Sequence, residues 1–279
     1  MTRSMAFPLA LLAAACAGPG LPRTPHGEEV LRVEGAVKGG PFRLGKADVA
    51  ALPRKMVVGV YPGSGRVVRY EGLDLWALEE RVDLAEGADT IVLDTGDHRS
   101  IAVPLSVVRE LRPVLSERAD GDPLAGSVVA WPIVEHHGLA SDPRAALWWA
   151  RDVVSVRFVA WDKVYGLALH LPEGAPAGAA AGAAIFGWRC LPCHRLRGTG
   201  GTLGPELAHA GRAPSPEKLR AALADHPGWT SPGAGAPGDL GVSQLATFLH
   251  TAARVLAEEG DAGPDPPTGP PRPVLTVPR

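Results

Sequence analysis

The sequence predicts an α+β protein, in which a strand-rich first domain is followed by a small all-α domain. Between residues 30 and 171, short β-branched runs are bounded by Gly and Pro, which is typical of strands. Residues 181–258 instead repeat apolar side chains at helical spacing. An Ala/Gly/Pro linker at 172–180 separates the two parts. The length of 279 residues and the hydrophobic content of 46% are sufficient for two modest domains.

In the first domain the expected helices are Leu73–Glu80 and Pro104–Leu111, and the second has Pro at its first turn. The expected strands are Val30–Val37, Met56–Tyr61, Val67–Tyr70, Thr90–Leu93, Ser127–Val134 and Val153–Trp161. Strands therefore dominate this part.

The second domain is expected to contain three helices. The first spans Ala179–Arg189, and the second runs from a Ser215 cap to about Asp225. The third is expected to be capped by Ser243, with apolar residues recurring from Leu245 onward. The tail at 259–279 is rich in Pro and is expected to be unstructured.

The N-terminus predicts export. Residues 1–16 place one basic residue before a short apolar run that ends at Cys16. This segment resembles a bacterial lipoprotein signal, which implies lipidation of Cys16 and a membrane anchor, although Leu12 lies one position earlier than the family prefers. The alternative is an ordinary signal cut after Ala15 or Ala17. Both place the protein on the periplasmic or cell-surface side, with a linker at 17–29.

Charge is nearly balanced, at 28 basic against 30 acidic residues, so no nucleic-acid partner is expected.

The chain has three Cys, and Cys190, Cys193 and His194 form a C-x-x-C-H motif, the attachment site of c-type haem. Two thiols at this spacing can reach the two vinyl groups of one porphyrin, with His194 as an axial ligand of the iron. The alternatives are a zinc site, which lacks a second Cys pair, and a thioredoxin-like dithiol, which lacks the βαβ context.

The second domain resembles a class I cytochrome c. The matching stretches are CLPCH at 190–194, GTGGTLGPEL at 198–207 and QLATFL at 244–249. The resemblance implies one covalent haem c, with Pro205 on its proximal side and a carbonyl there orienting His194.

The family usually supplies Met as the second axial ligand, but all three Met of this chain lie at or before Met56. The candidates for the sixth position are therefore His226, His209 and His250, or no protein ligand. His226 is favoured equally with an open site, and loss of the thioether predicts a lower haem potential.

The first domain resembles the molybdopterin-binding domain of sulfite-oxidase-type oxidoreductases. The matching stretches include LRVEGAV at 31–37, YEGLDLW at 70–76, DTGDHRS at 94–100 and VVSVR at 153–157. Catalytic members supply a Cys thiolate to molybdenum, yet no Cys occurs from residue 17 to 189. We therefore expect this fold without molybdopterin or metal. The His136–His137 pair is interpreted as a surface pair.

The sequence thus favours an exported monohaem c-type cytochrome that carries single electrons to or from redox partner proteins. Its first domain would serve docking or ligand binding, with no catalytic residue of its own. One alternative is a haem-containing sulfite-oxidase-type molybdoenzyme or its electron-transfer subunit. The other is a haem-based sensor or ligand binder, which the missing Met suggests.

Overall fold

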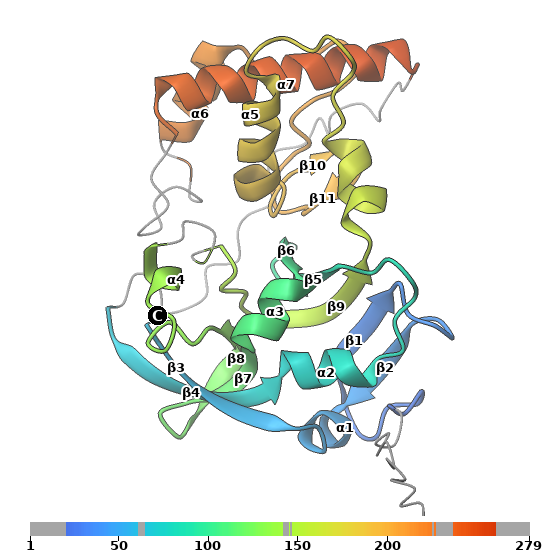
Figure 1. Cartoon of the computed structure of the whole chain (residues 1–279), viewed down its shortest axis with the longest axis vertical. Coiled ribbons are helices and arrows are strands. Elements are labelled where there is room, and N and C mark those ends of the chain that lie inside the picture. The colour runs from blue at the N-terminus through green and yellow to red at the C-terminus, as the bar shows by residue number, and fades with distance from the viewer. Residues whose placement is uncertain are drawn as a thin grey trace, which may run out of the picture.

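The computed structural model of the chain describes residues 21–60, 65–141, 145, 147–224, 226 and 237–260. Cys16 and the export signal, residues 17–20 of the first linker, Tyr61, Asp225 and the tail beyond 260 lie outside these residues. In chain order the elements are β1 (Glu29–Gly35), β2 (Phe42–Gly45), α1 (Lys46–Ala50), β3 (Arg54–Val60), β4 (Val67–Asp74), α2 (Leu75–Arg81), β5 (Thr90–Thr95), β6 (Ser100–Pro104), α3 (Leu105–Leu111), β7 (Val114–Ala119), β8 (Asp122–Ala130), α4 (Gly138–Ser141), β9 (Val153–Val159), the π-helical turn η1 (Asp162–Gly166), α5 (Ala179–Ile185), the π-helical turn η2 (Phe186–Cys190), β10 (Arg195–Leu196), β11 (Thr199–Gly200), α6 (Pro216–Ala224) and α7 (Asp239–Glu258) (Figure 1).

Two larger sheets form the first part of the molecule. One has five strands in the order β2-β1-β9-β5-β6, where β1 and β9 pair in parallel and the other neighbours are antiparallel. The other is a four-stranded antiparallel sheet in the order β3-β4-β7-β8. With these sheets and several helices, the chain has the mixed α+β character that the sequence predicts.

A large apolar cluster fills the first part and draws on both sheets. It includes Val57 and Leu115 from the four-stranded sheet and Ile91 and Phe158 from the five-stranded sheet. Trp131, which is 1% exposed, anchors the cluster, and its indole N–H donates to the carbonyl of Trp148 at 3.0 Å. A buried indole needs such a partner, because an unpaired N–H away from water costs about 1–3 kcal/mol.

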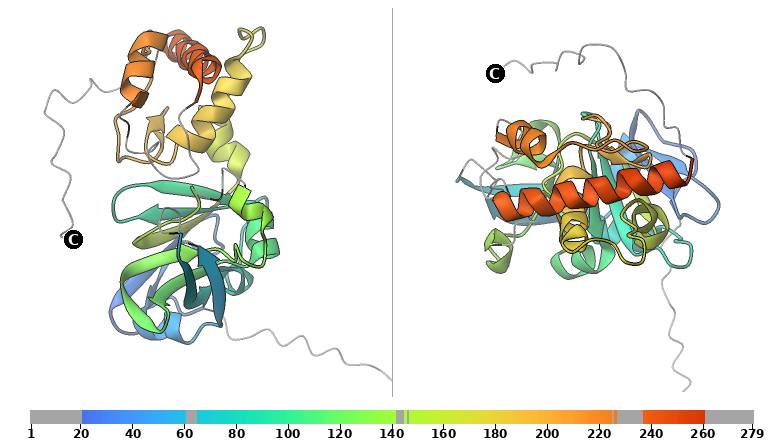
Figure 2. Two further views of the ribbon diagram at one scale, coloured as in Figure 1. Left: turned by 90° about the vertical axis from the view of Figure 1, so that its left-hand side faces the viewer. Right: turned by 90° about the horizontal axis from the view of Figure 1, so that it is seen from above.

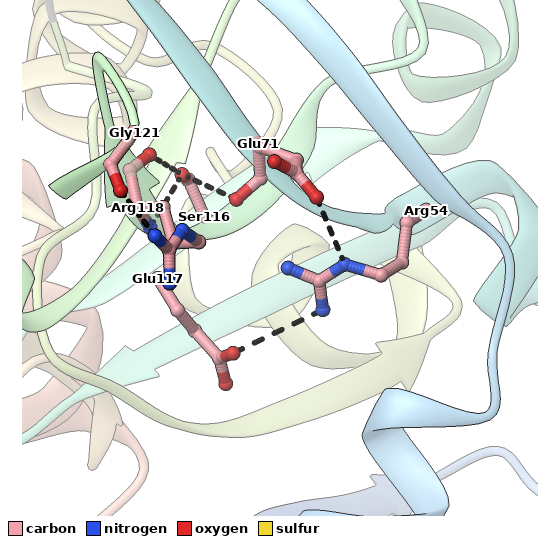
Figure 3. A network of polar contacts seen from close by, with 6 residues as sticks. All are labelled: Arg54, Glu71, Ser116, Glu117, Arg118 and Gly121. Carbon is pink, nitrogen blue, oxygen red and sulfur yellow. Dashed lines mark hydrogen bonds and ion pairs between the residues drawn. The ribbon is translucent and has the colours of Figure 1, made fainter. Parts of the chain in front are cut away.

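Polar contacts hold the four-stranded sheet in register where its ladder is irregular (Figure 3). The hydroxyl of Ser116 lies 2.9 Å from the carbonyl of Glu71 and 2.6 Å from that of Arg118. Arg54 on β3 reaches carboxylates on the next two strands, at 3.6 Å from Glu71 and 3.9 Å from Glu117. These contacts give the bulged strands partners that the backbone alone does not supply.

Helix α2 begins two residues later than the sequence predicts. The carboxylate of Asp74 accepts the backbone N–H of Trp76 at 3.0 Å, so Asp74 is the N-cap and Leu73 belongs to β4. The final helix differs in the same respect. It starts at Asp239 after Gly238, so the predicted cap Ser243 lies inside α7 rather than at its start. The N-cap is Gly238 in an extended conformation, and Val242 one turn later is buried.

The sequence did not predict three strands of the first part, β2, β6 and β7. All three are short or carry polar residues, so they lack a run of β-branched residues. The strand predicted at Ser127–Val134 instead spans Asp122–Ala130 as β8. It begins in a hairpin with β7 and ends two residues before Pro132.

The second part is organised by the crossing of α5 and α7 (Figures 1 and 2). At the crossing point Gly182 faces the last helix, and a Cβ built on it would lie 2.0 Å from the carbonyl oxygen of Gln244. One turn further along the chain, at the start of η2, Phe186 meets Phe248 with ring centroids 5.6 Å apart, and both are fully buried. The absence of a side chain at Gly182 is therefore what lets the two helix backbones approach.

We expect Gly182→Val to destabilise the protein by about 3 kcal/mol, because the added side chain forces the two helices apart. Ala180→Val on the exposed side of the same helix is the matched control, with a cost of about 0.7 kcal/mol from helix propensity. Urea unfolding followed by circular dichroism measures both. Equal losses for the two variants would show that the helices do not pack tightly at Gly182.

The five-stranded sheet is covered on both faces, and this joins the two parts of the molecule. Along β5, Ile91 and Leu93 belong to the first apolar cluster, whereas Val92 between them belongs to a second cluster. The second cluster also contains Phe186 and Phe248. In the left view of Figure 2, α5, α6 and α7 lie together at the top of the molecule, above the sheets of the first part. Residues 161–171, assigned to the first domain by sequence, contribute Trp161, Tyr165 and Leu169 to the second cluster.

Candidate functional site

The C-x-x-C-H motif lies at the end of the helical run formed by α5 and η2, which covers the helix predicted at Ala179–Arg189. The carbonyl of Cys190 accepts the backbone N–H groups of Cys193 at 3.0 Å and of His194 at 2.7 Å. These two bonds close the motif into one tight turn. The turn brings the two thiols and the imidazole onto one short stretch of backbone.

Both cysteines of the motif are free thiols rather than a disulfide. Cys190 is 6% exposed and packs in the second apolar cluster, and burial raises its pKa to about 12. Burial also raises the pKa of Cys193, which is less enclosed. The thiols are therefore neutral at physiological pH.

The imidazole of His194 is oriented by the loop that follows. Its Nδ1 lies 2.7 Å from the carbonyl oxygen of Pro205, so Nδ1 carries the proton and donates it. This is the contact that the resemblance implied for Pro205. The ring is 9% exposed, and burial lowers the pKa of His194, with the Pro205 bond acting in the opposite direction. The neutral ring therefore presents Nε2, with its lone pair, as a ligand atom.

Glycines in this loop allow it to lie directly against the motif. A Cβ on Gly204 would fall 2.2 Å from Cε1 of His194, and one on Gly201 would fall 2.0 Å from the carbonyl oxygen of Pro192. The backbone N–H of Gly204 donates to the carbonyl of Cys193 at 2.9 Å. The motif alone does not point to Gly204, but the G-x-x-G-P spacing of the loop could have indicated it.

Of the three candidate sixth ligands, His226 is the one that the structure places against His194. Their ring centroids are 5.8 Å apart, with 41° between the ring planes. His250 lies on the exposed side of α7, where its Nδ1 is 2.8 Å from the carbonyl of Ala246. His209 closes a turn with Arg212 through two backbone hydrogen bonds. Ala236, where the family carries Met, lies outside the described residues.

The motif also makes direct contact with the five-stranded sheet of the first part. The backbone N–H of Ser100, at the start of edge strand β6, donates at 2.9 Å to the carbonyl of Pro192 between the two cysteines. In addition, the carbonyl of His98 accepts the N–H of Thr202 at 2.9 Å. The motif thus supplies a hydrogen-bond acceptor for a backbone N–H on edge strand β6. Sequence reasoning missed this contact because β6 was not predicted.

Beside this contact lies a polar cluster on the face of the sheet turned toward the second part. Asp94 accepts the hydroxyl of Ser100 at 2.6 Å and pairs with Arg157, whose Nε is 2.5 Å away. The carboxylate of Asp94 raises the pKa of Arg157, and burial raises the pKa of Tyr165 next to it. Arg157 is therefore a permanent cation held between the two parts of the molecule.

Within the described residues, no group of three or more His, Cys, Asp or Glu is arranged to hold a metal ion. His137 is exposed and His136 is half-buried, and the backbone N–H of His136 donates to the carbonyl of Pro132 in the segment after β8. Among the same residues, no helix has the length and apolar character needed to cross a membrane.

No protein-family model and no curated protein matches the chain. Among solved structures, the chain is similar to the sulfane dehydrogenase SoxCD from Paracoccus pantotrophus, at 14% sequence identity and a TM-score of 0.36. The similarity covers 47% of this chain and 38% of that one, so the chain spans less than half of that protein's length. A likeness at this level carries no argument about function.

Proposed function

We propose that the chain is an exported, lipid-anchored monohaem c-type cytochrome that carries single electrons between redox partner proteins. The observation that carries the proposal is the C-x-x-C-H motif with two free thiols and a His194 whose Nδ1 is held by Pro205. A covalently bound haem would supply a one-electron Fe(III)/Fe(II) couple. The protein residues supply its attachment, its ligands and its surroundings.

The residues present fit such a group. Cys190 and Cys193 would form the two thioether bonds, each by addition of a neutral thiol to one vinyl group. His194 would ligate iron through Nε2, because its Nδ1 already donates to the Pro205 carbonyl. That hydrogen bond keeps the ring in one tautomer and makes it a stronger ligand. The absence of a Cβ on Gly204 leaves the space in which the ring lies.

We further propose that His226 is the sixth ligand. Metal–imidazole bonds are about 2 Å long, so two imidazoles that would share one metal ion have ring centroids within about 6 Å of each other. The observed separation of 5.8 Å between His194 and His226 agrees with this spacing. Replacement of a thioether by a second imidazole lowers the reduction potential expected for the haem.

For the first part we propose a sulfite-oxidase-like fold that works without molybdenum and serves docking or ligand binding. The absence of Cys from residue 17 to 189 removes the thiolate that such a metal centre would need. The hydrogen bond from Ser100 to Pro192 places this part against the haem-attachment motif.

An optical series on protein purified after export tests these assignments. The account predicts a haemochrome spectrum typical of two thioether bonds, a six-coordinate low-spin reduced spectrum, and slow reaction with CO. Rapid CO binding would favour the sensor alternative instead. Molybdenum in the metal analysis, at one atom per chain, would favour the molybdoenzyme.

Gly204→Ala is expected to abolish the six-coordinate low-spin spectrum while leaving the haem attached. The new methyl group would occupy the place of the His194 ring, 2.6 Å from its Nδ1, so the ring must leave the Pro205 carbonyl. Gly238→Ala is the matched control, since nothing lies within 4 Å of a Cβ there and its φ is −60°. An unchanged spectrum in Gly204→Ala would mean that His194 is not the axial ligand.

A further inference from the structure

A cavity of about 530 Å³ opens where the two parts of the molecule meet, and nothing in the proposed electron-transfer function uses it. We call it the junction cavity and define it by Asp89, Ala102, Trp148, Trp161, Trp188 and Pro192. Its volume lies within the range of sites that hold small organic ligands.

The residues that would hold a haem do not line the junction cavity. The motif contributes Leu191 and Pro192 to its wall, whereas Cys190, Cys193 and His194 are absent from it. The junction cavity is a separate site that shares one wall with the haem-attachment turn.

The wall of the junction cavity is mostly apolar and carries three indoles: Trp148, Trp161 and Trp188. Three Trp at one cavity is a high density for a chain with seven. Trp188 also remains 40% exposed, so part of its side chain lies at the solvent side. Indole faces attract cations more strongly than any other side-chain ring.

Among the described residues that line the junction cavity, Asp89 is the single charged side chain. Its Oδ1 accepts the Thr90 hydroxyl at 2.9 Å and the backbone N–H of Trp161 at 2.8 Å, which orients the carboxylate. Its Oδ2 has no hydrogen bond to the described part of the chain. Asp89 is an exposed residue, so its carboxylate lies at the solvent side of the junction cavity. Because no described lining residue is a cation, this negative charge attracts a positive ligand to that side.

The form of the cation follows from what the wall can satisfy. A primary ammonium keeps a strong hydration shell, which a mainly apolar wall with three hydroxyl residues (Thr90, Ser100 and Ser106) replaces only in part. An alkylated ammonium has few or no N–H groups and a weakly hydrated, apolar shell. Indole faces and one carboxylate suit it without leaving a donor unpaired.

We propose that the junction cavity binds a small alkylated ammonium compound, with Asp89 as its counter-ion and the three Trp as its aromatic wall. The inference goes beyond electron transfer, and the binding does not require the haem.

The test measures binding of choline to the full-length, haem-loaded protein by titration calorimetry. Dimethylbutanol, in which a tert-butyl group replaces the trimethylammonium, is the uncharged ligand of the same shape. We expect choline to bind at least about tenfold more tightly than dimethylbutanol. Comparable binding of the two ligands, or no choline binding up to high millimolar concentration, overturns the proposal.

Two variants assign the attraction to its residues. Asp89→Asn and Trp188→Leu should each weaken choline binding about fivefold and leave dimethylbutanol binding unchanged, because the first removes charge and the second removes the indole face while keeping apolar volume. Asp122→Asn, an exposed carboxylate on β8, is the matched charge control and should change neither.

If Asp89→Asn and Asp122→Asn have the same effect on choline binding, Asp89 is not the counter-ion and the proposal fails. A haemochrome spectrum taken on the same samples keeps the two hypotheses apart. Loss of covalent haem refutes the cytochrome function and leaves the choline result standing.

Discussion

The Cys190→Ala/Cys193→Ala double variant is expected to retain no haem after denaturation and solvent extraction. Both thioether bonds depend on these sulfurs, and the chain has no other Cys between residue 17 and its end. The wild-type protein, treated in the same way, should keep its haem in full. The measurement is the haemochrome absorbance of the protein fraction, normalised to the peptide concentration.

Each single variant refines this result. Cys190→Ala and Cys193→Ala should each keep one thioether and one unsaturated vinyl group, which moves the haemochrome band to longer wavelength. Because Cys190 is 6% exposed and Cys193 is less enclosed, we expect the Cys190 variant to be the less stable of the two. Haem that stays on the double variant through denaturation would contradict attachment by this motif.

His226→Ala is expected to convert the reduced protein from six-coordinate low-spin to five-coordinate high-spin haem. The His226 ring lies 5.8 Å from the His194 ring, and as a ligand it would compete with CO for the metal. If His226 is dissociated about 1% of the time in the wild-type protein, its removal raises the CO association rate about a hundredfold. Flash photolysis of the CO complex measures this rate.

The His226→Met variant tests the same position, because it replaces an imidazole ligand by a thioether ligand. A thioether in place of the imidazole should keep the haem six-coordinate and raise its reduction potential. His250→Ala and His209→Ala are the matched controls, because one ring is exposed on α7 and the other residue closes a turn with Arg212. A low-spin spectrum that survives His226→Ala but disappears in either control would assign the sixth ligand to that other histidine.

The local chemistry of the site could be predicted from sequence, because it depends on residues close together in the chain. The motif at 190–194 and the loop up to Pro205 span sixteen residues, and the hydrogen bond between His194 and Pro205 joins their two ends. The helices on either side were also predictable, since α5 and α7 bury continuous apolar faces.

The junction between the two parts was not predicted, because it depends on contacts distant in sequence. Ser100 and Pro192 are joined only when an edge strand meets the motif, and neither residue carries a local signal for this. The sequence of strand β5 did contain one signal for this junction. Ile91, Val92 and Leu93 form a continuous apolar run, and all three are buried. Such a run is typical of a strand covered on both faces, whereas alternation of polar and apolar residues is typical of a sheet with one face in water.

The most direct test of the cytochrome assignment is the haem content of the exported wild-type protein after denaturation and acid–acetone extraction. We expect one haem per chain in the protein fraction, with a haemochrome spectrum of two saturated vinyl groups, in a peptide that contains Cys190, Cys193 and His194. Haem found wholly in the extract, or protein without haem after export, would contradict it.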